Sequence, residues 1–198
     1  MTRIGARSGR RDAPGTTTVR GRRAAHGWRA APPRGGRIVW ITGLAGSGKT
    51  MVATAVVRGL GRARIAAVLL DGDALRRSIA TDLGYDLADR RRAAERYARL
   101  ARLLAAQGLT VVVATISMFE SVRRANRRRA PHYFEVYLRL AAGCAPRVRG
   151  RGGATPVVGR ELPFEAPVRP DLVVDGPLTR ARAASVGACI VRSLVHGT

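Results

Sequence analysis

The only lysine of this 198-residue chain lies in a glycine-rich segment with the spacing G-x-x-x-x-G-K-T. This is the P-loop pattern, in which backbone N–H groups turn inward around phosphate oxygens and a helix begins directly afterwards. Lys49 would reach the β- and γ-phosphates of a nucleoside triphosphate as a compact point charge, and the Thr50 hydroxyl would ligate Mg²⁺. The segment therefore predicts a site for ATP and Mg²⁺ formed by Gly43, Leu44, Ala45, Gly46, Ser47, Gly48, Lys49 and Thr50.

Two acids separated by one glycine follow a second apolar run, in Leu70-Asp71-Gly72-Asp73. Asp71 is placed to hold Mg²⁺ through water, and Asp73 is placed to orient or deprotonate an acceptor hydroxyl. Phosphoryl transfer depends mainly on charge neutralisation and alignment, so it needs few protein groups. The alternative is a surface turn in which Asp73 caps a helix. Because a P-loop lies upstream, we favour a phosphotransferase site in which Lys49 and Asp73 are catalytic.

These residues require a frame, and the hydrophobic pattern predicts one by alternating apolar runs with helical segments. Buried strands are predicted at 37–42, 66–71, 109–116, 133–140 and 171–175, and helices at 51–60, 86–107, 119–129 and 179–195. This order predicts a three-layer α/β/α fold of the P-loop NTPase type, with a mostly parallel five-stranded sheet. The P-loop, Asp71 and Ser117 all follow strands, and the carboxyl ends of parallel strands form the ligand-binding edge of such a sheet.

Residues 1–36 differ from the rest of the chain, because they hold nine arginines and one acid without hydrophobic periodicity. This composition predicts a disordered arginine-rich extension, followed by a kinase domain over 37–198. The extension lacks the apolar core of a secretory signal. An organellar transit peptide and an arm that contacts RNA or DNA remain alternatives to a tail without function.

The formal net charge of +23 would ordinarily favour a nucleic-acid or anionic-membrane partner. Arginine is heavily used while lysine is almost absent, which is typical of a GC-rich genome, so we give the charge little weight as a sign of nucleic-acid binding. Cys144 and Cys189 show neither metal-site spacing nor a disulfide framework. No apolar run approaches the roughly 20 residues of a membrane span. We expect a cytoplasmic protein with a small-molecule substrate and no membrane partner.

Several blocks in a fixed order resemble the adenylylsulfate kinase family, P-loop enzymes that phosphorylate the 3′-hydroxyl of adenosine 5′-phosphosulfate. The blocks span about 38–176 and read GLAGSGKT, LDGDALR, DLGYDLADR, QGLTVVVATIS, VVGRELPFEAP and PDLVVDG. The resemblance implies an ATP- and Mg²⁺-dependent kinase that makes 3′-phosphoadenylyl sulfate for sulfate activation. It also implies a homodimer, because enzymes of this family commonly pair.

The resemblance further implies which residues bind the acceptor. Arg76 and Arg90 would grip its phosphosulfate group, and planar guanidinium groups suit sulfate and phosphate oxygens. Tyr85, where the family usually has phenylalanine, and Phe164 would sandwich its adenine. Taken alone, the two arginines could equally be solvated side chains, and the two aromatic residues could belong to the core.

Three more positions complete the implied site. Ser117 would lie beside the path of the γ-phosphate as a catalytic and acceptor-binding residue. The backbone around Ile116 would line the acceptor site, and Asp73 would contact the acceptor hydroxyl.

The chain departs from the family pattern at three places. Ala93 stands where the family has an asparagine that contacts the acceptor, and the loss of one polar contact costs about 1 kcal/mol or more. Met118 replaces the proline after Ser117. The family's lid segment is absent, and a shorter stretch with Arg147, Arg149 and Arg151 takes its place. These arginines either replace some of the lid's charge or form a flexible basic loop, and a reduced lid predicts weak ATP affinity or wasteful hydrolysis.

Three functions therefore follow from the sequence. The leading one is an adenylylsulfate kinase. The second is a kinase on the same scaffold that phosphorylates another hydroxyl, such as that of a sugar, a nucleoside or a specialised metabolite, and Ala93 and the missing lid favour it. The third is a non-enzymatic nucleotide or nucleic-acid binder, which only the arginine excess favours and which the retained P-loop and acid pair oppose.

Overall fold

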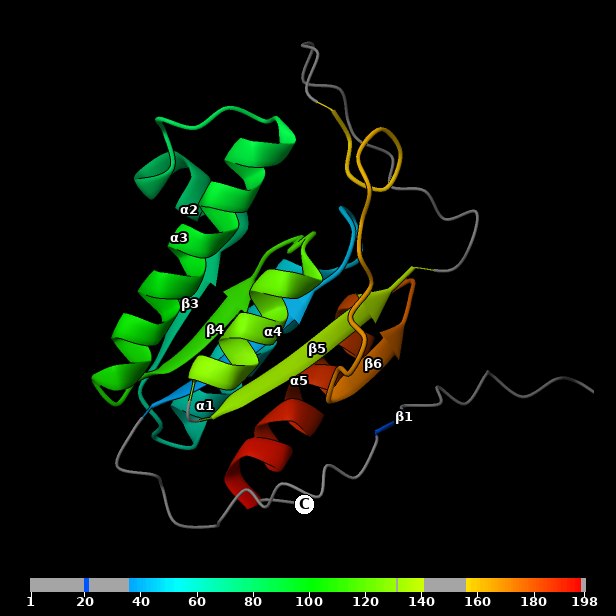
Figure 1. Ribbon diagram of the computed structural model, residues 1–198. Helices are drawn as coiled ribbons and strands as arrows, with labels where there is room; N and C mark the ends of the chain where they lie inside the picture. Colours follow the sequence, from blue (N-terminus) through cyan, green and yellow to red (C-terminus); the bar gives the residue numbers. More distant parts are fainter. Residues whose placement is uncertain (1–19, 22–35, 131, 141–155, 197–198) are drawn as a thin grey trace, which may run out of the picture.

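The computed structural model describes residues 20–21, 36–130, 132–140 and 156–196, and in these ranges a central sheet carries helices on both faces (Figure 1). The strands are β1 (Arg20–Gly21), β2 (Arg37–Thr42), β3 (Ala67–Asp71), β4 (Thr110–Ala114), β5 (Tyr133–Arg139) and β6 (Leu172–Asp175). The helices are α1 (Lys49–Arg62), α2 (Gly72–Ile79), α3 (Leu87–Ala106), α4 (Glu120–Arg129) and α5 (Arg180–His196). The predicted three-layer α/β/α fold is confirmed.

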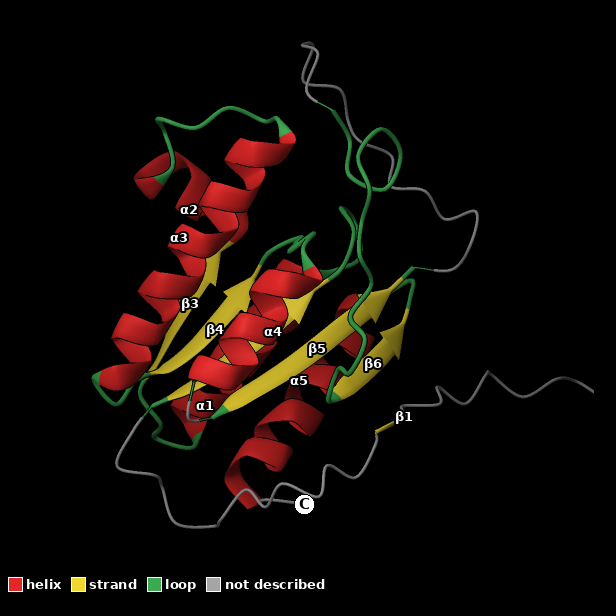
Figure 2. Ribbon diagram, in the orientation of Figure 1, coloured by secondary structure: helices red, strands yellow, loops and turns green. Residues whose placement is uncertain are grey.

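The strands lie in the order β1-β6-β5-β2-β4-β3 (Figure 2). β2 is central, because it pairs in parallel with β4 on one side and β5 on the other. β3 and β6 extend the parallel sheet outward, whereas β1 is antiparallel to β6. The chain runs from β2 to β3 and β4 on one side and then crosses to β5. This crossing makes the carboxyl end of β2 a topological switch point, where ligands bind in open α/β sheets.

Strand β2 is buried on both faces, as an apolar run in a central parallel strand requires. Ile38 and Trp40 pack into the cluster formed with α2, α3 and α4, while Val39 and Ile41 pack with α1 and α5. The two helical layers therefore rest on alternate residues of one strand, as the two-residue period of a strand dictates. This frame fixes the strand end from which the P-loop starts.

Two elements were not predicted. Helix α2 begins directly after β3, and its N-cap is Asp71, whose carboxylate accepts hydrogen bonds from the N–H groups of Asp73 (3.0 Å) and Ala74 (3.4 Å). The sequence alternative that placed the cap at Asp73 was therefore wrong by two residues.

Strand β1 adds a sixth strand and lies inside the extension predicted to be disordered. The rest of residues 1–35 lies outside the described residues, so the domain division near residue 36 stays a prediction.

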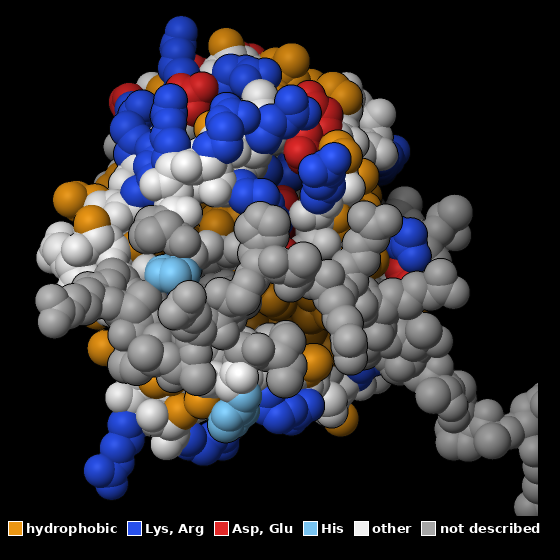
Figure 3. All heavy atoms as spheres, turned by 60° about the horizontal axis from the view of Figure 1, so that its bottom comes forward, with side chains coloured by type: hydrophobic (Ala, Val, Ile, Leu, Met, Phe, Trp, Pro, Cys, Tyr) orange, Lys and Arg blue, Asp and Glu red, His pale blue; other side chains and the backbone are white. Residues whose placement is uncertain are grey.

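The described surface is strongly basic. Lys and Arg side chains crowd the upper part of the view in Figure 3, with patches of Asp and Glu among them. Some arginines of the described chain have carboxylate partners, as Arg96 has in Asp82 (2.6 Å) and Arg139 in Asp175 (2.6 Å). With only 13 acids in the chain, most positive charge is not neutralised, and the field favours the approach of phosphates and sulfates. None of the helices in the described ranges combines the length and the apolar character that a bilayer crossing requires.

Candidate active site

The P-loop joins the end of β2 to the start of α1, and its shape depends on glycine. Gly48 is the N-cap of α1 with φ 91°, in the left-handed region that residues with a side chain rarely adopt. A Cβ at Gly43 would lie 2.4 Å from the Leu138 carbonyl oxygen, so only glycine fits there. The first turn of α1 contains no acid, and no side chain caps its N–H groups. The positive end of α1 is therefore available to an anion.

Lys49 points back into this loop. Its Nζ donates a hydrogen bond to the Leu44 carbonyl oxygen at 2.7 Å. Burial lowers the pKa of Lys49 to about 8, and the nearby carboxylates of Asp73 and Asp71 offset part of that effect. A desolvated ammonium group with spare donors is a strong point charge for phosphate oxygens.

Lys49 should become reactive at an unusually low pH. We expect acetylation by acetic anhydride to rise with a midpoint near the lowered pKa of about 8, because only the neutral amine is nucleophilic. Lys49 is the only lysine, so peptide mass spectrometry separates its signal from that of the N-terminal amine. Saturating ATP should protect it. A midpoint at the ordinary pKa of lysine, or no protection by ATP, would contradict this description of the loop.

Asp71 connects the P-loop to α2. The Thr50 hydroxyl donates to its Oδ2 at 2.8 Å, while its Oδ1 accepts the two N–H groups at the start of α2. Thr50 and Asp71 thus present adjacent hard oxygen atoms, which suit Mg²⁺. In the described part of the chain, no group of three or more His, Cys, Asp and Glu side chains could hold a metal ion.

A cavity of about 520 Å³ lies at the carboxyl ends of β2, β3 and β4. It is lined by the P-loop, the start of α2, the first turns of α3 and the segment after β4. The sequence-predicted site residues that share it are Ala45, Gly46, Gly48, Lys49, Thr50, Asp71, Asp73, Arg76, Tyr85, Arg90, Ile116 and Ser117. Gly43, Leu44 and Ser47 lie in the loop but do not line the cavity. Most of the predicted residues therefore converge from four separate segments.

Arg76 and Arg90 are not free solvated side chains. Arg76 donates to the carbonyl oxygens of Leu83 and Gly84, and Arg90 donates to those of Tyr85 and Pro156, both at 2.8 Å. Their guanidinium carbons lie 4.4 Å and 5.4 Å from the centre of the Tyr85 ring.

These contacts bring two like charges to one wall of the cavity. Burial, and then the charge of Arg76, lower the pKa of Arg90. An anion bound between the two guanidinium groups would relieve their repulsion, so this wall can bind a phosphate- or sulfate-bearing group.

Phe164 lies elsewhere. Its ring stacks on Tyr137, with centroids 6.1 Å apart, and it does not line the cavity. Tyr85 lines the cavity with 48% of its surface exposed. Of the two aromatic residues expected to sandwich the adenine, only Tyr85 therefore lines the cavity.

Ser117 has an unusual backbone for a residue with a side chain. Its φ is 50°, in the left-handed region, which costs about 1–3 kcal/mol unless the surroundings compensate. Trp40 donates its indole N–H to the Ser117 hydroxyl oxygen at 2.8 Å, and Thr42 donates to the Ile116 carbonyl oxygen at 2.6 Å. Both donors come from β2. Sequence reasoning missed them, although polar side chains inside an apolar strand could have indicated such a role.

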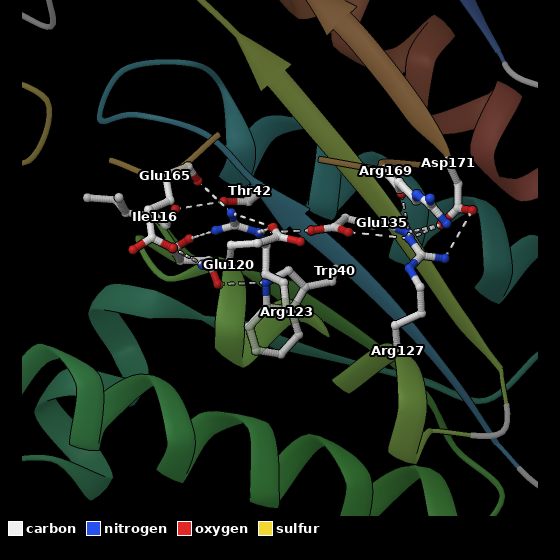
Figure 4. Close-up of polar contacts among 11 residues, drawn as sticks. Trp40, Thr42, Ile116, Glu120, Arg123, Arg127, Glu135, Glu165, Arg169 and Asp171 are labelled. Carbon is white, nitrogen blue, oxygen red and sulfur yellow. Dashed lines mark hydrogen bonds and ion pairs between the residues drawn. The ribbon is translucent and has the colours of Figure 1, made fainter. Parts of the chain in front are cut away.

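A buried arginine–carboxylate cluster behind the cavity was also missed. It consists of Glu120, Arg123, Arg127, Glu135 and Asp171 (Figure 4). Burial raises the pKa of Glu135 to about 7, while Arg123 and Arg127 act in the opposite direction. The available signal was Glu135 itself, an acid inside an apolar strand that must find a partner when buried.

The three departures from the family pattern lie in different surroundings. Ala93 lines the cavity and is 5% exposed, so the wall lacks a polar group there. Met118 is buried, and its carbonyl oxygen accepts a hydrogen bond from the N–H of Glu165 at 3.0 Å. Arg147, Arg149 and Arg151 lie outside the described residues.

This fold and this loop define the chain as a P-loop nucleotide-binding protein of the small-molecule kinase type. The family model described as adenylylsulphate kinase matches residues 35–175, and the chain belongs to this family of ATP-dependent kinases, which phosphorylate an alcohol group.

Individual relatives agree with this assignment. The adenylyl-sulfate kinase of Paraburkholderia xenovorans is 39% identical over 150 residues, covering 71% of this chain and 83% of the relative. That of Bacillus pumilus is 36% identical over 154 residues, covering 72% and 78%. The structure of the Mycobacterium tuberculosis APS kinase in complex with AMPPNP and APS matches with a TM-score of 0.70 and 31% identity, covering 80% of this chain and 97% of that one.

Proposed function

We propose that the protein transfers the γ-phosphoryl group of ATP to the 3′-hydroxyl of adenosine 5′-phosphosulfate and forms 3′-phosphoadenylyl sulfate. The observation that carries this proposal is that the P-loop and the two arginines, Arg76 and Arg90, line one and the same cavity. The solved Mycobacterium tuberculosis relative is in complex with AMPPNP and APS, which supports a site for two ligands of this kind.

The ATP side of the site is built to neutralise charge. The P-loop amides and Lys49 would hold the phosphates, and Thr50 and Asp71 would hold Mg²⁺, which supplies further neutralisation of the β- and γ-phosphates. In such transfer the protein mainly positions the reactants and stabilises charge on the transferring group.

The acceptor would bind to the part of the cavity wall that Arg76, Tyr85 and Arg90 form. Arg76 and Arg90 would bind the phosphosulfate, and the exposed ring of Tyr85 would stack on the adenine. Asp73, in the first turn of α2, lines the same cavity as Lys49 and the two arginines, and it would accept the proton of the attacking hydroxyl.

Ala93 favours a second candidate, a kinase of the same scaffold with another alcohol as acceptor. If adenosine 5′-phosphosulfate is the acceptor, Ala93→Asn should restore one polar contact and lower its KM by about fivefold, equivalent to about 1 kcal/mol. Steady-state kinetics with both substrates measures this. The control is Ala106→Asn, an exposed position of the same helix that does not line the cavity. A higher KM in Ala93→Asn, with the fold intact, would favour the other acceptor.

The proposal is tested by acceptor-dependent turnover. Purified protein with Mg-ATP is supplied separately with adenosine 5′-phosphosulfate, gluconate, a hexose and adenosine, and ADP formation is followed. We expect stimulation above the hydrolysis rate by adenosine 5′-phosphosulfate alone. Stimulation by one of the other alcohols and none by adenosine 5′-phosphosulfate would replace the proposed function with the second candidate.

We also propose that the protein acts in the cytoplasm as a homodimer, as the family resemblance implies. Light scattering of the purified protein would measure the mass of the particle in solution. A mass equal to that of one 21.2 kDa chain would contradict the dimer.

A further inference from the structure

Arg123 is the most deeply buried charged side chain of the arginine–carboxylate cluster, with 0% of its side chain exposed. It comes from the first half of α4, and its guanidinium group contacts the Ser117 carbonyl oxygen and the carboxylate of Glu135 in β5. Its contact with Glu135 can be followed in Figure 4. It does not line the cavity, so it would touch neither ATP nor the acceptor. A buried guanidinium group needs partners for all of its donors, and these partners show what it holds.

Two of those partners are backbone carbonyl oxygens from segments far apart in the chain. Arg123 donates to the carbonyl oxygen of Ser117 and to that of Glu165. It also donates twice to one carboxylate oxygen of Glu120, at 2.9 Å and 3.1 Å. The planar guanidinium fork thus fastens two loops to the first turn of α4, a task that the single ammonium group of lysine cannot reproduce.

These bonds act on a strained residue. Ser117 adopts the left-handed backbone described above, and Trp40 holds its hydroxyl from one side. Arg123 holds its carbonyl oxygen from the other side. Such backbone persists only when its surroundings fix it from more than one direction. Because Ser117 lines the cavity, the bonds that fix it also shape the wall of the site.

Further hydrogen bonds join the same segments. The Glu165 carboxylate accepts from the N–H of Glu120 at 2.6 Å, at the otherwise uncapped start of α4. The Glu165 N–H in turn donates to the Met118 carbonyl oxygen. The segment after β4, the start of α4 and the residues around Glu165 therefore form one unit, and Arg123 lies at its centre.

We infer that Arg123 is a positioning residue for phosphoryl transfer, which acts by holding Ser117 and the adjoining wall of the cavity in the conformation used for the reaction. The catalytic part of this inference rests on the proposed function. The structural part, that Arg123 fixes the position of Ser117, does not.

The cluster offers a matched control in Arg127, one turn further along α4. Arg127 donates to Asp171 (2.8 Å) and Glu135 (3.3 Å) and to the Arg169 carbonyl oxygen, but it contacts neither Ser117 nor Glu165. Arg123 lies 3.2 Å from the other oxygen of the same Glu135 carboxylate. Loss of either arginine therefore disturbs the buried charge balance, whereas only loss of Arg123 releases Ser117.

The experiment compares Arg123→Lys, Glu120→Gln and Arg127→Gln with the parent chain. All four proteins carry Trp28→Phe, so that Trp40 is the only tryptophan that fluoresces. We expect Arg123→Lys to change the emission of Trp40, because the Ser117 hydroxyl moves away from the indole N–H. Its kcat should fall by up to about 10²-fold, as expected for a misplaced catalytic group, with KM for ATP unchanged.

Glu120→Gln weakens the same unit without removing the arginine and should lower kcat by about tenfold. Arg127→Gln should lower the melting temperature and leave both readouts as in the parent chain.

The inference is overturned if folded Arg123→Lys keeps the parent emission and kcat, or if Arg127→Gln loses kcat to the same extent. Should Arg123→Lys fail to fold, Glu120→Gln decides by the same two readouts. If the parent chain makes no product from adenosine 5′-phosphosulfate, the proposed function fails, and the Trp40 emission still decides whether Arg123 fixes Ser117.

Discussion

The Asp73→Asn variant is expected to bind Mg-ATP with unchanged affinity and to lose phosphoryl transfer by about 10²–10⁴-fold. Asp73 is exposed at the start of α2 and lines the cavity that also holds Lys49. Within the described ranges, its carboxylate makes no hydrogen bond or ion pair, whereas the adjacent Asp71 caps the helix. Asparagine keeps the shape but cannot accept the proton of an acceptor hydroxyl. The loss should therefore appear in chemistry and not in folding.

Single-turnover transfer and equilibrium ATP binding, measured on the same sample, separate the two effects. Asp82→Asn is a suitable control, because Asp82 is an exposed acid paired with Arg96 outside the cavity. It should transfer phosphate as the wild type does. Weakened ATP binding with intact transfer in Asp73→Asn would assign Asp73 to the nucleotide and remove it from the acceptor.

The Lys49→Met variant should lose ATP affinity and also reduce transfer by about 10²–10³-fold at saturating ATP. Methionine fills the space of the lysine stem but carries no charge, so the desolvated ammonium beside the phosphates is lost. The hydrogen bond to Leu44 is also lost, which removes one of the contacts that hold the loop.

The melting temperature in the absence of ATP should change little in Lys49→Met, whereas the ATP-dependent rise in melting temperature should disappear. The comparison with Asp73→Asn is informative, because that variant should keep the rise. An ATP-dependent rise of normal size in Lys49→Met would show that the nucleotide binds elsewhere.

The parts of the fold that were predictable are those set by local pattern. The continuous β-branched run after Gly108 had to be a central parallel strand, and β4 is such a strand. The helix predicted over 86–107 is α3, which begins after the N-cap Asp86, whose carboxylate accepts the N–H of Asp89 at 2.7 Å. Helix α2 was missed because only Leu75 among its eight residues is buried, which leaves almost no hydrophobic period to read.

In the site, too, the residues that belong to local motifs could be predicted, and those that depend on distant contacts could not. The P-loop and the acid pair were visible because their spacing along the chain carries the chemistry. Trp40 and Arg123 were not, because each needs a partner far away in sequence: Ser117 lies 77 residues from Trp40, and Glu165 lies 42 residues from Arg123.

The adenine-binding role implied for Phe164 stays a prediction, because its ring does not line the cavity in this structure. The ring of Phe164 stacks on Tyr137 in β5 and packs against the hydrophobic core, so it does not point into the cavity. This position depends on the path of the segment that follows residue 155. A ligand that draws Phe164 toward Tyr85 would be needed to complete the adenine sandwich.

The most direct test of the whole account is the position of the new phosphate in the product. Protein, Mg-ATP and adenosine 5′-phosphosulfate are incubated, and the purified product is studied by phosphorus–proton correlation NMR. A phosphorus coupled to the 3′-proton of the ribose, formed by the wild type and not by Asp73→Asn, is the expected result. A phosphate on any other oxygen, or no phosphorylated product while ATP is turned over with another alcohol, would contradict the account.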